Sequence, residues 1–164
     1  MDPDDVVEML NAYFARLIPV IFAHNGTVDK YIGDAILAVF GSPEPDAQHH
    51  AKAVQAAVGM QAAMREVNAE RTAQGLVTCD IGIGVHCGQV IHGFIGALER
   101  MEFTVIGDAV NRASRYCDGA PPGEVLLSPE VHARVWTVVQ AEWTTIATKH
   151  EGDLVAYRLK GLKA

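Results

Sequence analysis

The sequence has no excess of positive charge. Its 13 lysines and arginines stand against 20 aspartates and glutamates, and the formal net charge is −7. A surface of that sign offers no basic footprint to nucleic acid or to an anionic membrane, so we expect neither a nucleic-acid partner nor direct membrane contact. A nucleotide remains compatible with this charge, because a local pocket can be basic on an acidic protein.

Cysteines, long apolar runs and low-complexity segments are also scarce. The three cysteines form no Cys-x-x-Cys pair, which gives no zinc framework and favours a reducing, cytoplasmic compartment. We find no apolar run near the ~20 residues that a membrane span requires. With 49% hydrophobic residues, the 164 residues are expected to form a single globular domain.

The hydrophobic periodicity predicts a mixed order of elements. Helices are expected over residues 2–25, 46–71 and 108–117, and in a short stretch from residue 129. Strands are expected over residues 27–32, 35–40, 79–87, 89–95, 103–106, 124–127, 138–144 and 154–159. This order predicts the α+β class with a largely antiparallel sheet.

The first candidate site lies in the predicted hairpin. Lys30 is on one strand, and Gly33 and Asp34 form the turn. A carboxylate beside a glycine can hold a hard cation such as Mg²⁺, because the missing side chain lets water or phosphate approach. The alternative is an ordinary turn, since turns favour glycine and aspartate for local reasons.

The second candidate site is a strand that enters a helix through Gly107, with Asp108 as the expected N-cap. Asn111 lies in the first helical turn, where free backbone N–H groups favour an anion, and Arg115 follows on the same face. Together they suit a phosphate whose charge grows during a reaction. The alternative is an ordinary capped helix with a solvated arginine.

A third stretch, residues 149–153, lies between two predicted strands. Lys149 could reach a polyphosphate there, and the alternative is a solvated turn.

Together and in this order, these segments resemble the class III adenylate and guanylate cyclase catalytic domain. The resemblance covers nearly the whole chain and is carried by residues 2–7, 11–14, 24–35, 81–88, 100–108 and 110–115. It implies a ferredoxin-like (βαββαβ) cyclase fold, and a head-to-tail homodimer with sites at the interface. It also implies two Mg²⁺ (or Mn²⁺) ions per site.

The resemblance assigns a role to each candidate residue. Asp34 resembles one of two metal-binding aspartates. Lys30 and Thr104 resemble the pair that reads the purine edge, in the bacterial form that uses ATP. Asn111 and Arg115 resemble the residues that orient the ribose and stabilise the transition state. Lys149 resembles the lysine that binds the terminal phosphates, although the usual following glycine is replaced by His150.

The family's first strand, with its first metal aspartate, is expected before the helix that opens at Asp2. We therefore expect residues 1–164 to be a cyclase domain that lacks its first strand and is part of a longer gene product with regulatory domains. Little activity and an atypical or strand-exchanged oligomer are expected of it. The alternatives are a non-catalytic nucleotide-binding relative and a dimerisation module.

Overall fold

The computed structural model describes residues 1–149 and 151–164, in which helices and strands are interspersed. The helices are α1 (Pro3–Ala23), α2 (His49–Ala73), α3 (Asp108–Gly119) and α4 (Pro129–Val135). The strands are β1 (Gly26–Ile32), β2 (Ala35–Phe40), β3 (Ile83–Val85), β4 (Ile91–Ala97), β5 (Arg100–Ile106), β6 (Val125–Leu127), β7 (Val139–Thr148) and β8 (Gly152–Leu162). The α+β class predicted from the sequence is confirmed.

The strands form three sheets among the described residues, where the sequence predicted one. Hairpins β1–β2 and β4–β5 stand apart from a four-stranded sheet of order β3-β6-β8-β7. Pairing is antiparallel except between β3 and β6. In the described chain no strand joins β2 to β3, so each of them is paired along one edge only. This is the physical reason for the difference from the predicted single sheet.

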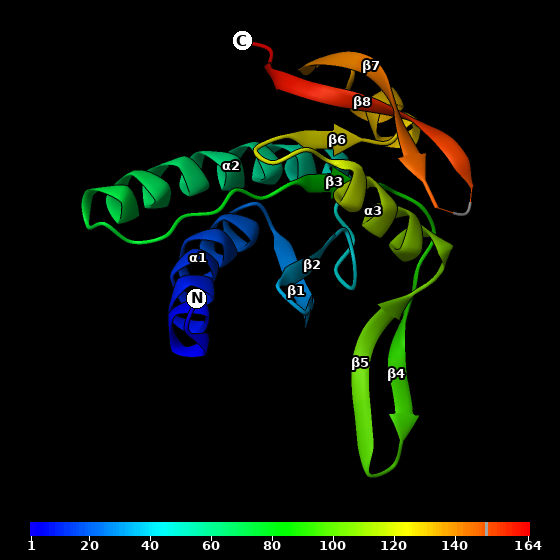
Figure 1. The fold of residues 1–164 in the computed structure, drawn as a ribbon. Helices are drawn as coiled ribbons and strands as arrows, with labels where there is room; N and C mark the ends of the chain where they lie inside the picture. Colours follow the sequence, from blue (N-terminus) through cyan, green and yellow to red (C-terminus); the bar gives the residue numbers. More distant parts are fainter. Residues whose placement is uncertain (150) are drawn as a thin grey trace.

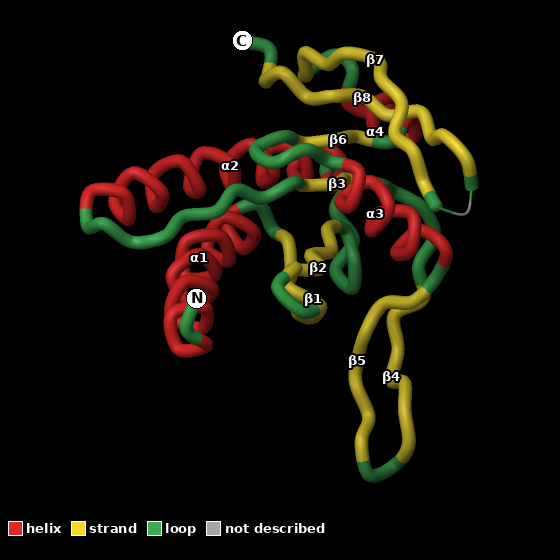
Figure 2. Tube along the Cα trace, viewed as in Figure 1, coloured by secondary structure: helices red, strands yellow, loops and turns green. Residues whose placement is uncertain are grey.

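The strand expected over residues 79–87 is much shorter in the structure and covers only Ile83–Val85. A loop precedes it and runs beside α2 (Figure 2). The ladder to β6 spans only these three residues, and the preceding backbone makes most of its hydrogen bonds to side chains instead. The prediction failed because an alternating pattern shows a buried face but not whether a partner strand lies alongside.

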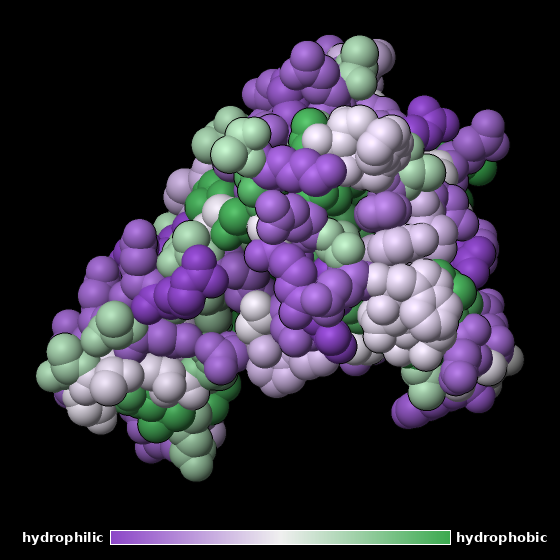
Figure 3. Space-filling view, turned by 90° about the horizontal axis from the view of Figure 1, so that it is seen from above, coloured by the Kyte–Doolittle hydropathy of each residue, from purple (hydrophilic) through white to green (hydrophobic). Residues whose placement is uncertain are grey.

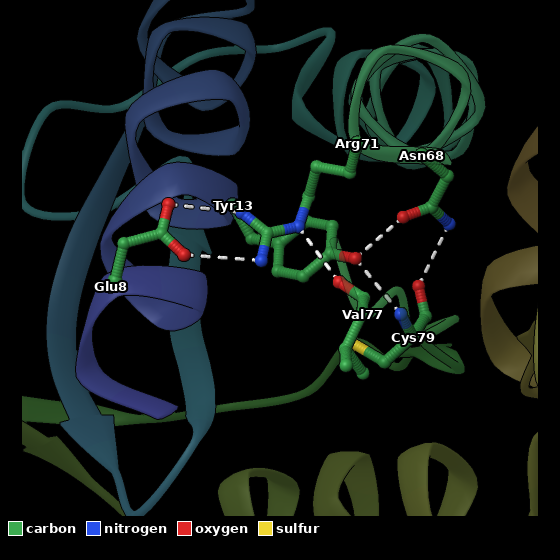
Figure 4. Close-up of polar contacts among 6 residues, drawn as sticks. All are labelled: Glu8, Tyr13, Asn68, Arg71, Val77 and Cys79. Atoms are coloured by element: carbon green, nitrogen blue, oxygen red, sulfur yellow. Dashed lines mark hydrogen bonds and ion pairs between the residues drawn. The ribbon is translucent and has the colours of Figure 1, made fainter. Parts of the chain in front are cut away.

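Side chains from α1 and α2 hold this loop in place (Figure 4). Arg71 of α2 donates to Val77 O at 2.8 Å and forms a bidentate pair with Glu8 of α1. Tyr13 Oη accepts from the backbone N–H of Cys79 at 2.8 Å and donates to Asn68 Oδ1. The loop therefore satisfies its backbone through buried polar side chains, as a segment without a ladder partner must.

Helix α1 packs against α2 through Tyr13, Leu17, Met64 and Val67. By length and composition alone, α1 is long and apolar enough to cross a membrane, so the expectation that no segment reaches that length is wrong. One such helix near the N-terminus is weak evidence of a span, because core helices of other proteins pass the same test.

The β4–β5 hairpin projects from the body as an arm (Figure 1). Residues 97–101 form the tip of this arm. Large apolar side chains are exposed along it: Ile91, Phe94, Ile95, Leu98, Met101, Phe103 and Ile106. On the face of the body seen in Figure 3, hydrophilic residues are interspersed with hydrophobic groups. A concentration of exposed apolar side chains on one projecting hairpin indicates a contact surface.

Helix α3 lies against β3 with almost no space between the two backbones. A Cβ added at Gly84 would lie 2.2 Å from Cys117 N and 2.6 Å from Tyr116 C. A side chain at position 84 would therefore push α3 away from the sheet. Because α3 carries two candidate site residues, this glycine fixes the position of part of the site.

Candidate active site

A buried carboxylate brings Lys30 and Thr104 together. Thr104 Oγ1 donates to Asp29 Oδ2 at 2.6 Å, and Lys30 Nζ lies 3.9 Å from the same oxygen. The other oxygen, Oδ1, accepts from the backbone N–H of Val105 at 3.2 Å. Asp29 therefore ties β1 to β5 across 75 positions of sequence. The two residues predicted to read the purine edge share one partner.

A β-bulge at Asp29 explains this convergence. Val28 is paired with Ala38 and Lys30 with Leu37, so Asp29 is an extra residue on its strand. A bulge changes the direction of side chains that would otherwise alternate between the two faces. Asp29 can then lie against Thr104, while Lys30, its neighbour in the chain, lies 3.9 Å from the Asp29 carboxylate.

Asn111 and Arg115 lie on α3, one turn apart. The N-cap of α3 is Gly107, with φ +140° and no side-chain cap, so the expectation that Asp108 is the N-cap is wrong. Glycine adopts this φ without strain, and the first backbone N–H groups donate no hydrogen bond to a capping side chain. Asn111 is exposed in this first turn. The arrangement suits an anion at the helix start.

Arg115 is half-buried, and its Nη1 lies 2.9 Å from Glu151 Oε1. Glu151 belongs to the turn between β7 and β8, and Lys149 is exposed in the same turn. This ion pair therefore brings the third candidate stretch next to α3. His150 lies outside the described residues.

Asp34 is exposed at the tip of the β1–β2 hairpin, beside Gly33 at φ +60°. No atom lies within 4 Å of the position a Cβ would take at Gly33, so water or phosphate has room to approach. The oxygen donors of Asp34 fit one ligand of a hard cation. Within residues 1–149 and 151–164, no group of three or more His, Cys, Asp or Glu side chains is placed to hold a metal ion.

The region between β3 and α3 disfavours charge. Burial is the main cause that lowers the pKa of His86 and raises the pKa values of Cys87, Tyr116 and Cys117. The three cysteines are free. These side chains therefore favour their neutral forms.

The comparisons identify the family. The model of the adenylate and guanylate cyclase catalytic domain matches residues 1–161. The chain belongs to this family. The predicted resemblance is thereby confirmed, and the residues described above lie in a cyclase domain.

Relatives of this cyclase domain include an adenylate cyclase of Anabaena cylindrica, which is 43% identical over 119 residues. The match covers 70% of this chain and 23% of that protein. A protein of Mycobacterium tuberculosis is 39% identical over 144 residues, covering 87% of this chain and 25% of that protein. The cyclase domain thus spans about a quarter of the length of these relatives.

Solved structures agree with the family and the fold. The guanylyl cyclase Cya2 matches with a TM-score of 0.92 at 33% identity, covering 99% of this chain and 84% of that one. The adenylyl cyclase CyaB of P. aeruginosa matches with a TM-score of 0.86 at 26% identity, covering 97% and 84%. Because the two differ in nucleotide, the fold alone does not decide between ATP and GTP.

Two residues contact candidate site residues of the cyclase domain, and these contacts were not predicted from the sequence. Asp29 and Glu151 pair with Thr104 and Arg115, respectively, across large sequence separations. The only signal in the sequence was their position beside Lys30 and Lys149.

Proposed function

We propose that this cyclase domain converts ATP to 3′,5′-cyclic AMP and pyrophosphate, in signal transduction. The observation that carries the proposal is the convergence of Lys30 and Thr104 on Asp29. An ammonium group can donate to N1 of adenine, and a hydroxyl oxygen can accept from its 6-amino group. The adenylate cyclase relatives support the same nucleotide.

In this proposal the ribose 3′-oxygen attacks the α-phosphorus in line and pyrophosphate leaves. Asn111 orients the ribose, Arg115 faces the charge that develops on phosphorus, and Lys149 binds the terminal phosphates. Asp34 would hold Mg²⁺ or Mn²⁺. Two such ions, when bound, would lower the pKa of the attacking hydroxyl and neutralise the leaving group.

A homodimer is proposed as the working assembly, within a longer protein that carries regulatory domains. The exposed apolar residues of the β4–β5 arm support a second copy as partner. In the described part of the chain, β2 and β3 each have one edge without a partner strand. This supports strand exchange, because an unpaired edge accepts a strand from another segment or chain. The free cysteines fit the cytoplasm.

The nucleotide assignment predicts a preference for ATP over GTP. Guanine presents an N1–H donor and an O6 acceptor, which is the opposite pattern, and would leave buried groups unpaired. We expect kcat/KM of the full-length protein to be at least about tenfold higher for ATP. Comparing turnover of the two nucleotides with Mg²⁺ tests this, and equal efficiencies would remove the assignment.

Residues 1–164 on their own are expected to show little or no turnover with Mg²⁺. Asp34 provides one carboxylate for two cations, and cations held close together need more negative ligands to offset their repulsion. Cyclic AMP formation by the 164-residue chain, with Mg²⁺ and with Mn²⁺, measures this. Robust Mg²⁺-dependent turnover would mean that another carboxylate completes the site.

Nucleotide binding by the full-length protein without turnover would favour a non-catalytic module instead.

A further inference from the structure

A threonine hydroxyl alone does not distinguish adenine from guanine. It has one O–H donor and two acceptor lone pairs, so it can accept from the 6-amino group of adenine or donate to O6 of guanine. Selectivity of a site built on Thr104 therefore depends on where the hydroxyl proton points. The structure contains a group that fixes the direction of this proton.

The hydroxyl proton of Thr104 is directed at Asp29. The Oγ1–Oδ2 distance is 2.6 Å, and a carboxylate offers this hydroxyl only acceptor atoms. The side chain of Asp29 is 3% exposed and Thr104 is 6% exposed, so water has little access to compete for the proton. The proton of Thr104 is therefore occupied, and only its lone pairs remain for a ligand.

Asp29 is itself held in place from several sides. Its Oδ1 accepts from the backbone N–H of Val105, and His92 Nε2 lies 3.9 Å from the same atom. The bulge in β1 brings Lys30 to 3.9 Å from Oδ2. Lys30 can only donate, so the cluster presents one obligate donor and one oxygen that can only accept.

We propose that Asp29 is a specificity-determining positioning residue, which holds the Thr104 hydroxyl so that the site accepts a 6-aminopurine and rejects a 6-oxopurine. The inference rests on the proposed cyclase function and deepens it, since it names a residue that acts on the base only through Thr104. A purely structural tie between β1 and β5 would stabilise the fold but would not change the preference between the two bases.

The test is Asp29→Asn in the full-length protein. The introduced amide has nearly the same shape as the carboxylate that it replaces. Its oxygen still accepts from Val105 N–H, and its NH₂ group donates to Thr104 Oγ1. That reverses the hydrogen bond and frees the threonine proton to reach a guanine O6. We expect the ratio of kcat/KM for ATP to that for GTP to fall by about tenfold or more. Asp80→Asn is the matched control, because Asp80 is an exposed carboxylate outside the cluster. The ratio of kcat/KM for ATP to that for GTP should not change in this variant.

Thermal unfolding of each variant separates folding from specificity. If Asp29→Asn does not fold, Thr104→Val decides, because it keeps Asp29 and its bond from Val105. If Thr104 acts on the base only as an acceptor, this variant loses about tenfold in kcat/KM for ATP and little in kcat/KM for GTP. An equal loss for both nucleotides, or an unchanged ratio in folded Asp29→Asn, would overturn the inference while the cyclase function stands. Turnover of neither nucleotide by the wild type would refute the proposed function, and this inference with it.

Discussion

Arg115→Ala and Asn111→Ala, each in the full-length protein, are expected to lower kcat for ATP by about 10²–10³ and to change KM far less. The reason is the contact with the reacting ribose and phosphate that we propose for the two residues. In the first turn of α3 Asn111 is exposed, and Arg115 follows one turn later. In the proposed mechanism these groups contact charge that is greatest in the transition state, and losing such contacts lowers kcat rather than substrate affinity.

Steady-state kinetics with ATP and Mg²⁺ measure the split between kcat and KM. Arg134→Ala is a matched control, because Arg134 is an exposed arginine in the last turn of another helix, α4. It should leave both constants unchanged. If Arg115→Ala raised KM alone, Arg115 would bind substrate and transition state equally, and the proposed role in stabilising the transition state would be wrong.

Gly84→Ala is expected to destabilise the protein by about 3 kcal/mol, since the added methyl would overlap the backbone of α3. A flexible side chain could move aside, but the atoms at 2.2 Å and 2.6 Å belong to the helix backbone at Cys117 and Tyr116. The whole helix must then shift, and Asn111 and Arg115 shift with it. We therefore expect a loss of activity even where the variant remains folded.

Thermal unfolding measures this effect, with an expected decrease in Tm of about 10 °C for a domain of this size. Gly161→Ala in β8 is the control, because no atom lies within 4 Å of the added methyl and the backbone has no positive φ. Equal stability of the two variants would show that α3 can move away from β3 at little cost.

The elements that local patterns specify were predicted from the sequence. The hairpin of β1 and β2 was predicted nearly to the residue, because Gly33 and Asp34 mark its turn between two apolar runs. The short helix α4 was predicted to begin at residue 129, and Ser128 caps it there, accepting from Val131 N–H. Local sequence is sufficient where the signal and the structure lie in the same few residues.

Features that depend on distant partners were not predicted. The ladder of β3 is short because β3 is paired with only one strand among the described residues, and its sequence carries no sign of that. Arg71 is buried on α2 because Glu8 and the carbonyl of Val77 satisfy its guanidinium, and Glu8 is far from it in the sequence. The bulge at Asp29 and its bond to Thr104 likewise arise only once β1 meets β5.

The same limit applies to the candidate site. Its residues could be named because they occur in recognisable segments, but their partners could not. Thr104 was expected to meet a base, and the structure shows that its proton is already donated to Asp29. Arg115 was expected to meet a phosphate, and it lies beside Glu151. Such pairings decide how a site works, and they depend on tertiary structure.

The most direct test of the cyclase assignment is to identify the products formed from ATP by the full-length protein with Mg²⁺. We expect 3′,5′-cyclic AMP and pyrophosphate in equal amounts, with turnover reduced about 10²–10³-fold in Arg115→Ala. ATP that is bound but not converted, or cyclic GMP formed from GTP at least as efficiently, would contradict the account.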